Sequence, residues 1–256
     1  MANERLRGAI LASGLTVEQI AEQMGVSART VDRWLEAKDQ RRPYRRHQYA
    51  LANLLRRDLS DLWSDEQSAS ELAEAGRAEL VKLYPNRAVV PKELWTSLYA
   101  GATRNFDLVV YAGFWLSEDP LFFRLIREKA NAGVLVRLML GDPDSAPVAQ
   151  RGEDEGIGPA MGGKIRNALA NYGPLFGVPG VEFRLHATTL YNSLYRADDN
   201  MLVNGHVYGM GAYLSPVMHL SQVPGAELFS TYAASIERIW EGSRRINSPR
   251  LEGDTA

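Results

Sequence analysis

Residues 186–206 concentrate polar side chains whose functional groups are those of a binding or catalytic site. These side chains are His186, Tyr191, Asn192, Tyr195, Arg196, Asp198, Asp199, Asn204 and His206. Two neighbouring carboxylates can act as a general acid and base, and a polar cluster in a cleft is typical of a ligand site. The alternative is a structural network that fixes strand register. Because no clear nucleophile or set of metal ligands accompanies the carboxylates, we take the cluster as a candidate ligand-binding site and expect no catalytic residues.

A glycine-rich segment, GPAMGGKI at residues 158–165, has the Gly-x4-Gly-Lys spacing of a phosphate-binding loop. However, Ile165 stands where that loop needs Ser or Thr for magnesium, and the preceding RGEDEG is polar where a strand is required. These departures argue against a nucleotide hydrolase. The segment is then a glycine-rich loop leading into a helix. Lys164 and Arg166 near its start either attract an anion or are simply solvated.

Two arginines near the N-terminus have side chains suited to contacting a nucleic acid. Arg29 and Arg33 are four residues apart and share one face of a predicted helix, and an arginine can bind a guanine edge bidentately. The outward positions of this helix are Ser27, Ala28, Arg29, Thr30, Asp32 and Arg33. All of these except Asp32, with Thr16 and Gln19 of the preceding helix, belong to the candidate DNA-binding set. Arg41, Arg42, Arg45 and Arg46 follow around Pro43 as candidate phosphate contacts.

Helix signals at the N-terminus are strong enough to position these arginines. Apolar residues recur at helical spacing over 3–13, 17–24 and 28–37. Thr16 and Gln19 form a capping-box pattern, Gly25 suits a turn with positive φ, and Ser27 is a good N-cap. Val31, Trp34 and Leu35 would then face inward. The pattern predicts two helices joined by a tight turn.

The stretch LTVEQIAEQMGVSARTVDRWLEAK, residues 15–38, resembles the helix-turn-helix of the Xre, lambda-repressor-like transcription regulators. Residues 47–63 resemble that family's two closing helices. The resemblance implies that residues 28–37 enter the major groove and that dimers bind half-sites about 34–36 Å apart. An ordinary helical hairpin is the alternative. Residues 35–38, LEAK, replace the Glu-x-Gly of many relatives, which leaves the contacts of residues 38–47 open.

The rest of the chain has the pattern of an α/β domain. Strands are predicted at 107–115, 134–140, 181–186, 188–195, 199–204 and 206–210, and helices at 119–131, 160–173 and 226–241, with a polar loop at 141–159. The strand–helix–strand order over 107–140 predicts parallel pairing. We therefore expect a helix-turn-helix domain at 1–63, a helical connector at 64–90 with helix formers over 65–83, an α/β dimerisation and sensor domain at 91–245, and a flexible tail at 246–256.

Residues 186–211 resemble the strand–turn–strand that carries the His-x-Lys-x4-Asp motif of the phospholipase D-like fold. Aligning Asn204-Gly205 with the family's Asp-Gly places the active positions on Ala197, Asp199 and Asn204. Alanine cannot attack phosphorus, and an aspartate would repel a phosphate. The resemblance therefore implies a domain without that family's chemistry. One copy of the half-repeat per chain implies a homodimer.

Composition narrows the remaining choices. The 256 residues include no cysteine and four histidines, which excludes disulfide frameworks and cysteine-ligated metal sites, and we expect no metal and no cofactor. No apolar run is long enough for a membrane helix and no signal peptide is evident, so a cytoplasmic protein without a membrane partner is expected. The net charge of −2 divides into +3 over residues 1–63 and −5 over 64–256, with +6 concentrated in residues 29–57.

The combined prediction is a sequence-specific DNA-binding transcriptional regulator. Its second domain is expected to dimerise and is a candidate sensor for a small-molecule or protein effector, while double-stranded DNA is the main partner. Two alternatives stay open at this point. One is a phospholipase D-like nuclease or phosphodiesterase tethered to DNA by the helix-turn-helix, and the other is an antitoxin-like protein-interaction module.

Overall fold

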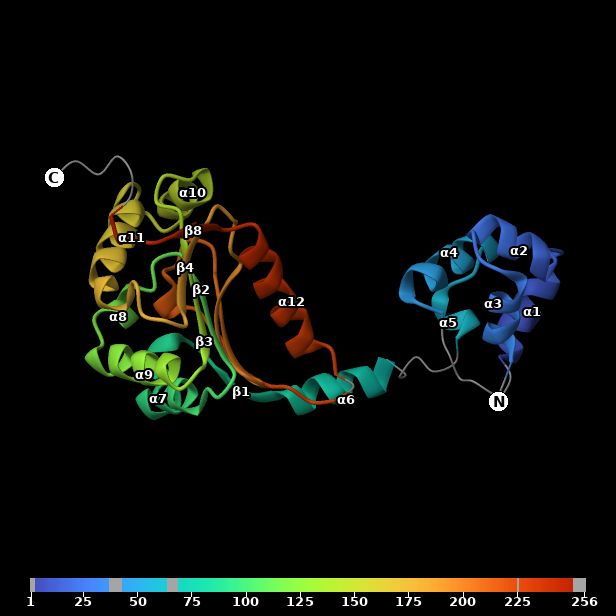
Figure 1. Ribbon diagram of the computed structural model, residues 1–256, viewed down its shortest axis with the longest axis horizontal. Coiled ribbons are helices and arrows are strands. Elements are labelled where there is room, and N and C mark those ends of the chain that lie inside the picture. Colours follow the sequence, from blue (N-terminus) through green and yellow to red (C-terminus); the bar gives the residue numbers. More distant parts are fainter. Residues whose placement is uncertain (1–2, 37–42, 64–68, 225, 251–256) are drawn as a thin grey trace. The chain divides into compact units, whose positions relative to one another are not determined.

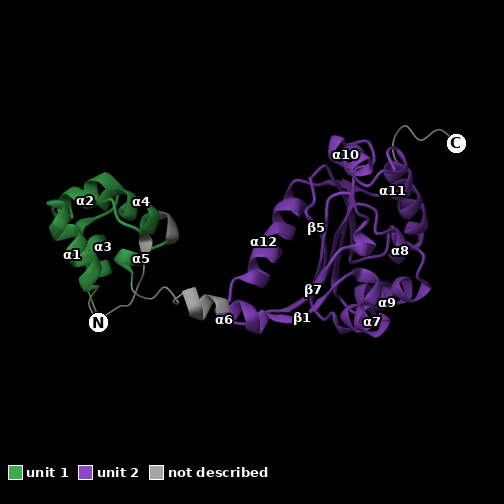
Figure 2. Ribbon diagram, turned by 180° about the vertical axis from the view of Figure 1, so that it is seen from behind, with its two compact units in different colours: residues 1–71 green, residues 72–256 purple. Residues whose placement is uncertain are grey.

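The chain forms two compact units, residues 1–71 and residues 72–256 (Figures 1 and 2). Figure 1 shows the computed structural model, which describes residues 3–36, 43–63, 69–224 and 226–250. Each unit has its own hydrophobic core. This arrangement confirms the predicted fold class, a helical head followed by a mixed α/β domain.

The first unit is built of short helices. They are α1 (Glu4–Ser13), α2 (Val17–Met24), α3 (Ala28–Leu35), α4 (Arg45–Leu55) and α5 (Leu59–Leu62). Gly14 and Gly25 end α1 and α2 with φ of 71° and 64°, a backbone conformation that favours glycine. Ile20, Val31 and Leu51 are fully buried where α2, α3 and α4 meet. The local turn signals therefore set the helix boundaries, and apolar packing joins the helices.

The second unit is an eight-stranded mixed sheet covered by helices. Its elements are α6 (Ala69–Glu79), β1 (Leu80–Tyr84), η1 (Arg87–Val89), α7 (Lys92–Gly101), β2 (Asn105–Val110), α8 (Phe114–Ser117), α9 (Pro120–Asn131), β3 (Leu135–Gly141), α10 (Ala146–Asp154), α11 (Ala160–Asn171), η2 (Gly173–Leu175), β4 (Val181–His186), β5 (Asn192–Ala197), β6 (Asn200–Gly205), η3 (Ala212–Leu214), β7 (Val217–Ser221), α12 (Leu228–Glu241) and β8 (Arg244–Ile246). The strand order is β1-β7-β6-β5-β2-β3-β4-β8.

Strands β2, β3 and β4 run parallel, and the remaining neighbours pair antiparallel. The parallel pairing of β2 with β3 through α9 confirms the prediction from the strand–helix–strand order. Strands β5 and β6 form a hairpin whose turn is Asp198-Asp199. The hairpin pairs with β2 through β5, and it therefore joins the parallel and antiparallel halves of the sheet.

Helices cover both faces of this sheet. Figures 1 and 2 show α12 on one face and α7, α8, α9 and α11 on the other. Glu79 holds the start of α12, because its Oε2 accepts hydrogen bonds from the amides of Leu228 and Phe229 at 2.8 and 3.1 Å. A carboxylate at a helix N-terminus is also favoured by the helix dipole. Glu79 is 149 positions from Leu228 and 150 from Phe229 in the sequence, so this contact is a long-range one.

Several element predictions for this unit were wrong in detail. The apolar run 107–115 ends as a strand at Val110, because Gly113 adopts a φ of 58° and begins α8. Residues 206–210 form no strand, and Gly209 turns the chain with a φ of 74°. The predicted loop 141–159 contains α10. The helix expected over 65–83 ends at Glu79, and residues 80–84 pair with β7 as an edge strand, so part of the expected connector belongs to the sheet.

No helix in the described part of the chain is long and apolar enough to cross a membrane.

Candidate nucleic-acid interface and ligand cavity

Helix α3 presents its polar face to solvent and its apolar face to the core. Val31, Trp34 and Leu35 are buried, whereas Arg29 and Arg33 are exposed on the other side. Ser27 caps the helix, since its Oγ accepts a hydrogen bond from the Thr30 amide at 3.2 Å and lies 2.8 Å from the Thr30 hydroxyl. Ser27, Arg29 and Arg33 therefore share one exposed surface, with Ala28 and Thr30 half-buried beside them.

Thr16 and Gln19 are exposed and complete a capping box at the start of α2. The Thr16 amide donates to Gln19 Oε1 at 2.9 Å, and the Gln19 amide donates to Thr16 Oγ1 at 3.3 Å. This reciprocal pair fixes the first turn of the helix that precedes α3. The predicted cap is confirmed, while its contact with DNA stays a prediction.

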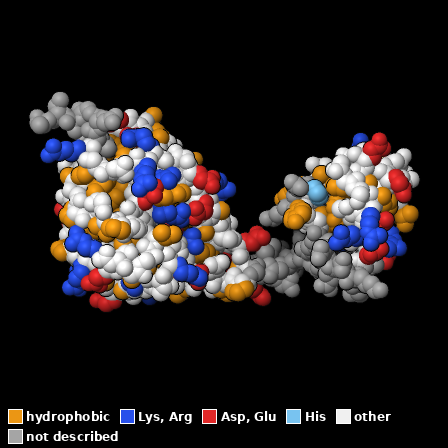
Figure 3. Space-filling model, in the orientation of Figure 1, with side chains coloured by type: hydrophobic (Ala, Val, Ile, Leu, Met, Phe, Trp, Pro, Cys, Tyr) orange, Lys and Arg blue, Asp and Glu red, His pale blue; other side chains and the backbone are white. Residues whose placement is uncertain are grey.

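The basic segment after α3 is only partly described. Arg41 and Arg42 lie outside the described residues, and Arg45 and Arg46 begin α4, where only the backbone is described. Figure 3 shows a group of basic side chains on the visible face of the first unit, among acidic and apolar ones. The predicted phosphate contacts of these four arginines are therefore not located.

The polar cluster predicted over residues 186–206 is divided between the two ends of the β5–β6 hairpin. At the turn, Asp198 adopts a φ of 52° and accepts hydrogen bonds from the amides of Thr103, Arg104 and Asn105 at 2.7, 2.9 and 2.9 Å. The Thr103 hydroxyl adds a further bond of 2.7 Å. Asp199 pairs with Arg104 at 2.7 Å. This end of the hairpin is a structural anchor for the segment that precedes β2.

Burial raises the pKa of the Asp198 carboxyl, but the hydrogen bonds from Asn105, Thr103 and Arg104 lower it more, and the resulting pKa is about 2. The carboxylate is therefore fully charged at neutral pH. Arg196 adds to the turn by donating from Nε to the Asp198 carbonyl at 2.9 Å. The Asp198 carboxylate thus accepts its hydrogen bonds from three backbone amides and one hydroxyl of residues 103–105, which fits a structural role.

Asn204 and His206 lie at the opposite end of the hairpin, and His186, at the end of β4, lies on the same side of the sheet, by the end of β2. Burial lowers the pKa of His186 to about 4, and its Nε2 lies 3.0 Å from the Val110 carbonyl oxygen. Burial, followed by the charge of Arg151, also lowers the pKa of His206 to about 4. Asn204 is fully buried and donates to the carbonyls of Ser215 and Pro216 at 3.1 Å each.

His206 also forms a pair with Ser193. Its Nδ1 lies 3.1 Å from the Leu190 carbonyl oxygen, which can only accept, so Nδ1 carries the proton of the neutral ring. Nε2 then accepts from the Ser193 hydroxyl at 3.0 Å. The geometry resembles a serine–histidine pair, but a histidine with a pKa of about 4 is a weak base at neutral pH.

The length of β5 keeps the aspartates at the turn apart from the histidines and Asn204 at the other end. The six residues of β5 lie between them, which corresponds to about 17–20 Å. Tyr191 is 78% exposed, and Tyr191 and Asn192 line a shallow hollow beside α12. The active positions suggested by the phospholipase D-like alignment do not meet either: Ala197 is buried, Asp199 lies at the turn, and Asn204 lies at the far end.

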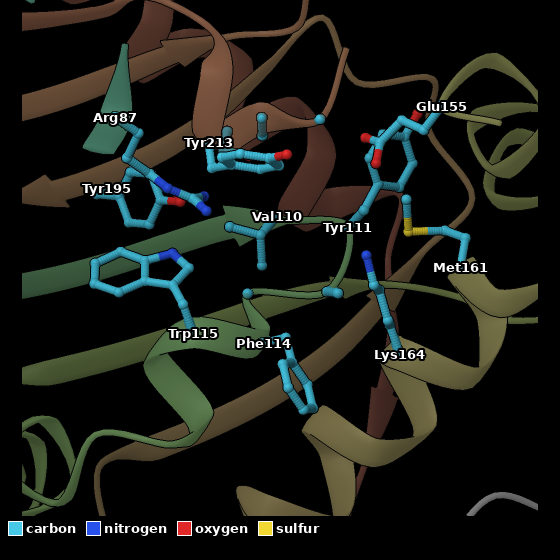
Figure 4. Close-up of a pocket in the computed structure, with 15 residues that line it drawn as sticks. Arg87, Val110, Tyr111, Phe114, Trp115, Glu155, Met161, Lys164, Tyr195 and Tyr213 are labelled. Atoms are coloured by element: carbon cyan, nitrogen blue, oxygen red, sulfur yellow. The ribbon is translucent and has the colours of Figure 1, made fainter. Parts of the chain in front are cut away.

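A cavity of about 240 Å³ lies where β2 ends, on the face covered by α8 and α11 (Figure 4). Tyr195 and Ser193 line it from β5, Phe114 and Trp115 from α8, and Lys164 from α11. Arg87 of η1, Glu155 after α10 and Tyr213 of η3 complete its polar and aromatic walls. The carboxyl ends of parallel strands are a usual place for ligand sites in α/β sheets.

Sequence reasoning found Tyr195 but missed Arg87 and Trp115. Arg87 stood in the expected connector, and Trp115 stood at the end of an expected strand. The chain crossing from β1 to β2 brings Arg87 to the site, and α8, directly after β2, brings Trp115, so that the Arg87 guanidinium lies 5.2 Å from the centre of the Trp115 ring. Lys164 of the glycine-rich segment does reach a cavity. The segment follows α10 and not a strand, consistent with the argument against a nucleotide-hydrolase loop.

A second polar network lies on the sheet face beneath α12. Asp107 of β2 is fully buried, and its Oδ1 accepts a bond of 2.6 Å from Arg137 Nε. Arg137 also donates to both carboxylate oxygens of Glu237 at 2.6 and 2.8 Å. Arg196 Nη1 lies 3.6 Å from Asp107 Oδ2. Arg196 therefore joins this network, on the opposite face from Tyr195. No group of three or more histidine and acidic side chains among the described residues is placed to hold a metal ion.

Comparison with known proteins supports a helix-turn-helix domain in the first unit. A family model described as a homeodomain-like domain matches residues 4–42. No curated protein sequence matches the chain.

Among solved structures, the phospholipase D family member Nuc from Salmonella typhimurium is 12% identical with a TM-score of 0.38, over 65% of this chain and 97% of that one. NucT from Helicobacter pylori is 10% identical with a TM-score of 0.38, over 70% and 95%. TrmBL2, an archaeal chromatin protein described as having a novel mode of DNA binding, is 14% identical with a TM-score of 0.42, over 95% and 93%. The chain thus combines a homeodomain-like helix-turn-helix domain with a mixed α/β domain.

Proposed function

We propose that this protein is a cytoplasmic, sequence-specific DNA-binding transcriptional regulator that acts as a homodimer. In this proposal, α3 of the first unit reads the major groove, and the second unit dimerises and responds to an effector. An effector regulates such a protein only if it favours one placement of the two DNA-binding units over another. The sign of regulation is left open.

The observation that carries the proposal is the two-sided character of α3. Its buried residues anchor it to α1 and α2, and Trp34 also lies against His47 of α4, while Ser27 at its N-terminus and both arginines are exposed. A recognition helix contacts bases with the side chains of its exposed N-terminal part. The charge of +6 over residues 29–57 supplies attraction to the phosphate backbone.

Within the helix-turn-helix class, we favour the lambda-repressor-like, Xre type. A homeodomain is a three-helix variant of this motif. In the described residues of the first unit, α4 and α5 follow α3, and Leu51, Leu62 and Trp63 from this region are buried in the same core. Two further packed helices after the recognition helix match the arrangement that the resemblance of residues 47–63 implies.

The first prediction concerns Arg29. Once genome-wide mapping has identified a bound site, Arg29→Ala is expected to weaken binding to it by about 1–3 kcal/mol, or about 5- to 150-fold, and to relax base preference. Gel-shift titration with a panel of single-base variants measures both effects. Arg7→Ala removes an exposed arginine of α1, outside the basic residues 29–57, and is the matched control, expected to bind as wild type. Unchanged binding by the Arg29 variant would overturn the assignment of α3.

We also propose that the second unit has no phosphodiesterase activity. The suggested active positions Ala197, Asp199 and Asn204 are separated, and the Ser193–His206 pair has a weak base. The labelled DNA of the gel-shift experiment, run on a denaturing gel after incubation, is therefore expected to stay intact. Cleavage lost in Ser193→Ala would favour the tethered-nuclease alternative instead.

The edge of the sheet supports a dimer. Strand β1 ends the strand order, so its outer edge has no partner strand in the described chain, and Val81 and Leu83 are 55% and 58% exposed there. Exposed apolar side chains on an unpaired edge favour pairing with another strand. A second copy of the chain is the partner that DNA binding to two half-sites requires.

The second prediction tests this edge. In sedimentation velocity, Leu83→Lys is expected to weaken self-association of the full-length chain at least tenfold, because a charged side chain on an edge strand opposes pairing. Leu135→Lys is the matched control, since Leu135 of β3 is similarly exposed at 64% but pairs internally. A wild-type chain that stays monomeric at micromolar concentration contradicts the dimer. Equal weakening by both variants contradicts the proposed edge.

A further inference from the structure

Two buried hydrogen-bonding groups in the wall of the cavity have no partner. The hydroxyl of Tyr195 and the indole Nε1 of Trp115 are both buried, and neither bonds to another group of the described chain. Tyr195 as a whole is fully buried. Leaving such a group unpaired costs about 1–3 kcal/mol, so most buried polar groups in native proteins are bonded. The two groups therefore indicate a partner that enters the cavity.

The charge of the cavity indicates the sign of that partner. Arg87 and Lys164 line the cavity, and no acidic group of the described residues lies within ion-pair distance of either. Glu155 also lines it, but its carboxylate is engaged by Arg151 at 2.6 Å. The cavity therefore has two cations without a counter-ion and one neutralised carboxylate. This balance favours an anion.

The placement of these groups indicates how an anion would be held. Figure 4 shows the Arg87 guanidinium, the Tyr195 hydroxyl and the Trp115 indole gathered at one end, with Lys164 pointing in from α11 on another side. The Arg87 guanidinium, the Trp115 indole N–H and the Tyr195 hydroxyl can all donate, a combination that suits carboxylate or phosphate oxygens. Phe114, Tyr111 and Tyr213 supply apolar and aromatic wall between the two ends.

Size limits the ligand further. The cavity volume of about 240 Å³ is below the ~300–1,000 Å³ of sites for drug-sized ligands. A nucleotide or an oligonucleotide end is too large to be enclosed. A single ring carrying one acidic group matches the volume, the aromatic wall and the donor cluster together.

We propose that this cavity binds a small organic acid, with its carboxylate or phosphate group held by Arg87, Trp115 and Tyr195 and its body against Phe114 and Tyr213. The proposal deepens the effector part of the proposed function by naming the site and the ligand class. It assigns Lys164 to the same anion or to a second polar group of the ligand. Ser193 is already bonded to His206 and serves as wall.

The experiment is titration calorimetry of the full-length chain with three single-ring probes, benzoate, phenyl phosphate and benzyl alcohol. At least one of the two acids is expected to bind saturably, once per chain, and at least tenfold more tightly than the neutral alcohol. The acid that binds more tightly shows whether the site prefers a carboxylate or a phosphate. Arg87→Gln is expected to weaken the binding of that acid at least tenfold. Tyr195→Phe and Lys164→Gln are expected to weaken it at least threefold, and exposed Lys164 offers a variant that leaves the core intact.

Arg124→Gln provides the control for nonspecific charge effects, because Arg124 is an exposed arginine of α9 that forms a salt bridge with Glu128 on the helix surface. It is expected to bind as wild type. The proposal is overturned if neither acid binds, if the alcohol binds as tightly, or if Arg124→Gln weakens binding as much as Arg87→Gln. DNA binding is measured separately without probes, so failure of the DNA assay and failure of acid binding are told apart.

Discussion

Replacing Asp107 with alanine is expected to lower the free energy of unfolding of the second unit by about 3–5 kcal/mol. Asp107 is fully buried, and its carboxylate is the buried partner of Arg137, with Arg196 3.6 Å away. Removing one member of a buried ion pair leaves the other charges desolvated and only partly compensated. The same strand ends at Val110, which lines the cavity together with Tyr111 directly after it, so loosened pairing of β2 is also expected to weaken ligand binding.

Hydrogen exchange in increasing urea, read by mass spectrometry in peptides from β2 and β3, measures this effect in the second unit alone. Glu237→Gln is the control within the same network, because Glu237 bonds the same arginine but is 48% exposed. Its loss is expected to lower stability by about 1 kcal/mol or less, as for solvent-exposed ion pairs. Equal losses of unfolding free energy for the two variants would show that the burial of Asp107 does not determine its contribution to stability.

The first unit was predictable because its determinants are local. Gly14, Thr16, Gly25 and Ser27 each adopt the conformation or make the cap that their residue type favours within four positions of the sequence. The inward positions Val31 and Trp34 follow from helical spacing alone. Signals of this range are contained in a short window, and the recognition helix could therefore be assigned without knowledge of the rest of the chain.

The cavity was not predictable for the opposite reason. Its walls come from η1, α8, α11, β5 and η3, whose proximity depends on the strand order of the whole sheet. Nothing near Arg87 in the sequence indicates that it will lie over Trp115. The polar residues of 186–206 are close in the sequence, but the β5–β6 hairpin places those at its turn far from those at its open end. Successive side chains of a strand also point to opposite faces of the sheet, which separates Arg196 from Tyr195.

This division explains why closeness in the sequence did not predict which polar side chains converge. Asp198 and Asp199 are adjacent, but one is held by backbone amides and the other by an exposed arginine at the surface. A carboxylate pair acts as general acid and base only when both groups face one substrate. The side chains that do converge come from distant parts of the sequence: Arg87 of η1, Trp115 of α8 and Tyr195 of β5.

Acid is expected to remove the contribution of Asp198 to stability. Its folded pKa of about 2 lies below the value of about 3.9 for an unfolded aspartate, so the folded state holds the proton less tightly. The contribution is therefore fully present above about pH 4 and is lost as the pH falls toward 2. A difference of this size corresponds to roughly 2–3 kcal/mol. Exchange of β2 and β5 peptides between pH 6 and pH 2.5 measures it in the wild type.

Asp198→Asn tests the same carboxylate at fixed pH. Asparagine tolerates the φ of 52° at this position but offers one acceptor oxygen to groups that now fill two, because Oδ1 and Oδ2 each accept two bonds. The variant is expected to be about 2–3 kcal/mol less stable at pH 7 and to lose much of the acid dependence. Asp199→Asn, next to it in the same turn and 53% exposed, is expected to change stability by less than about 1 kcal/mol. If the two variants behave alike, charge at the turn, and not the hydrogen bonds that join it to residues 103–105, holds the hairpin against β2.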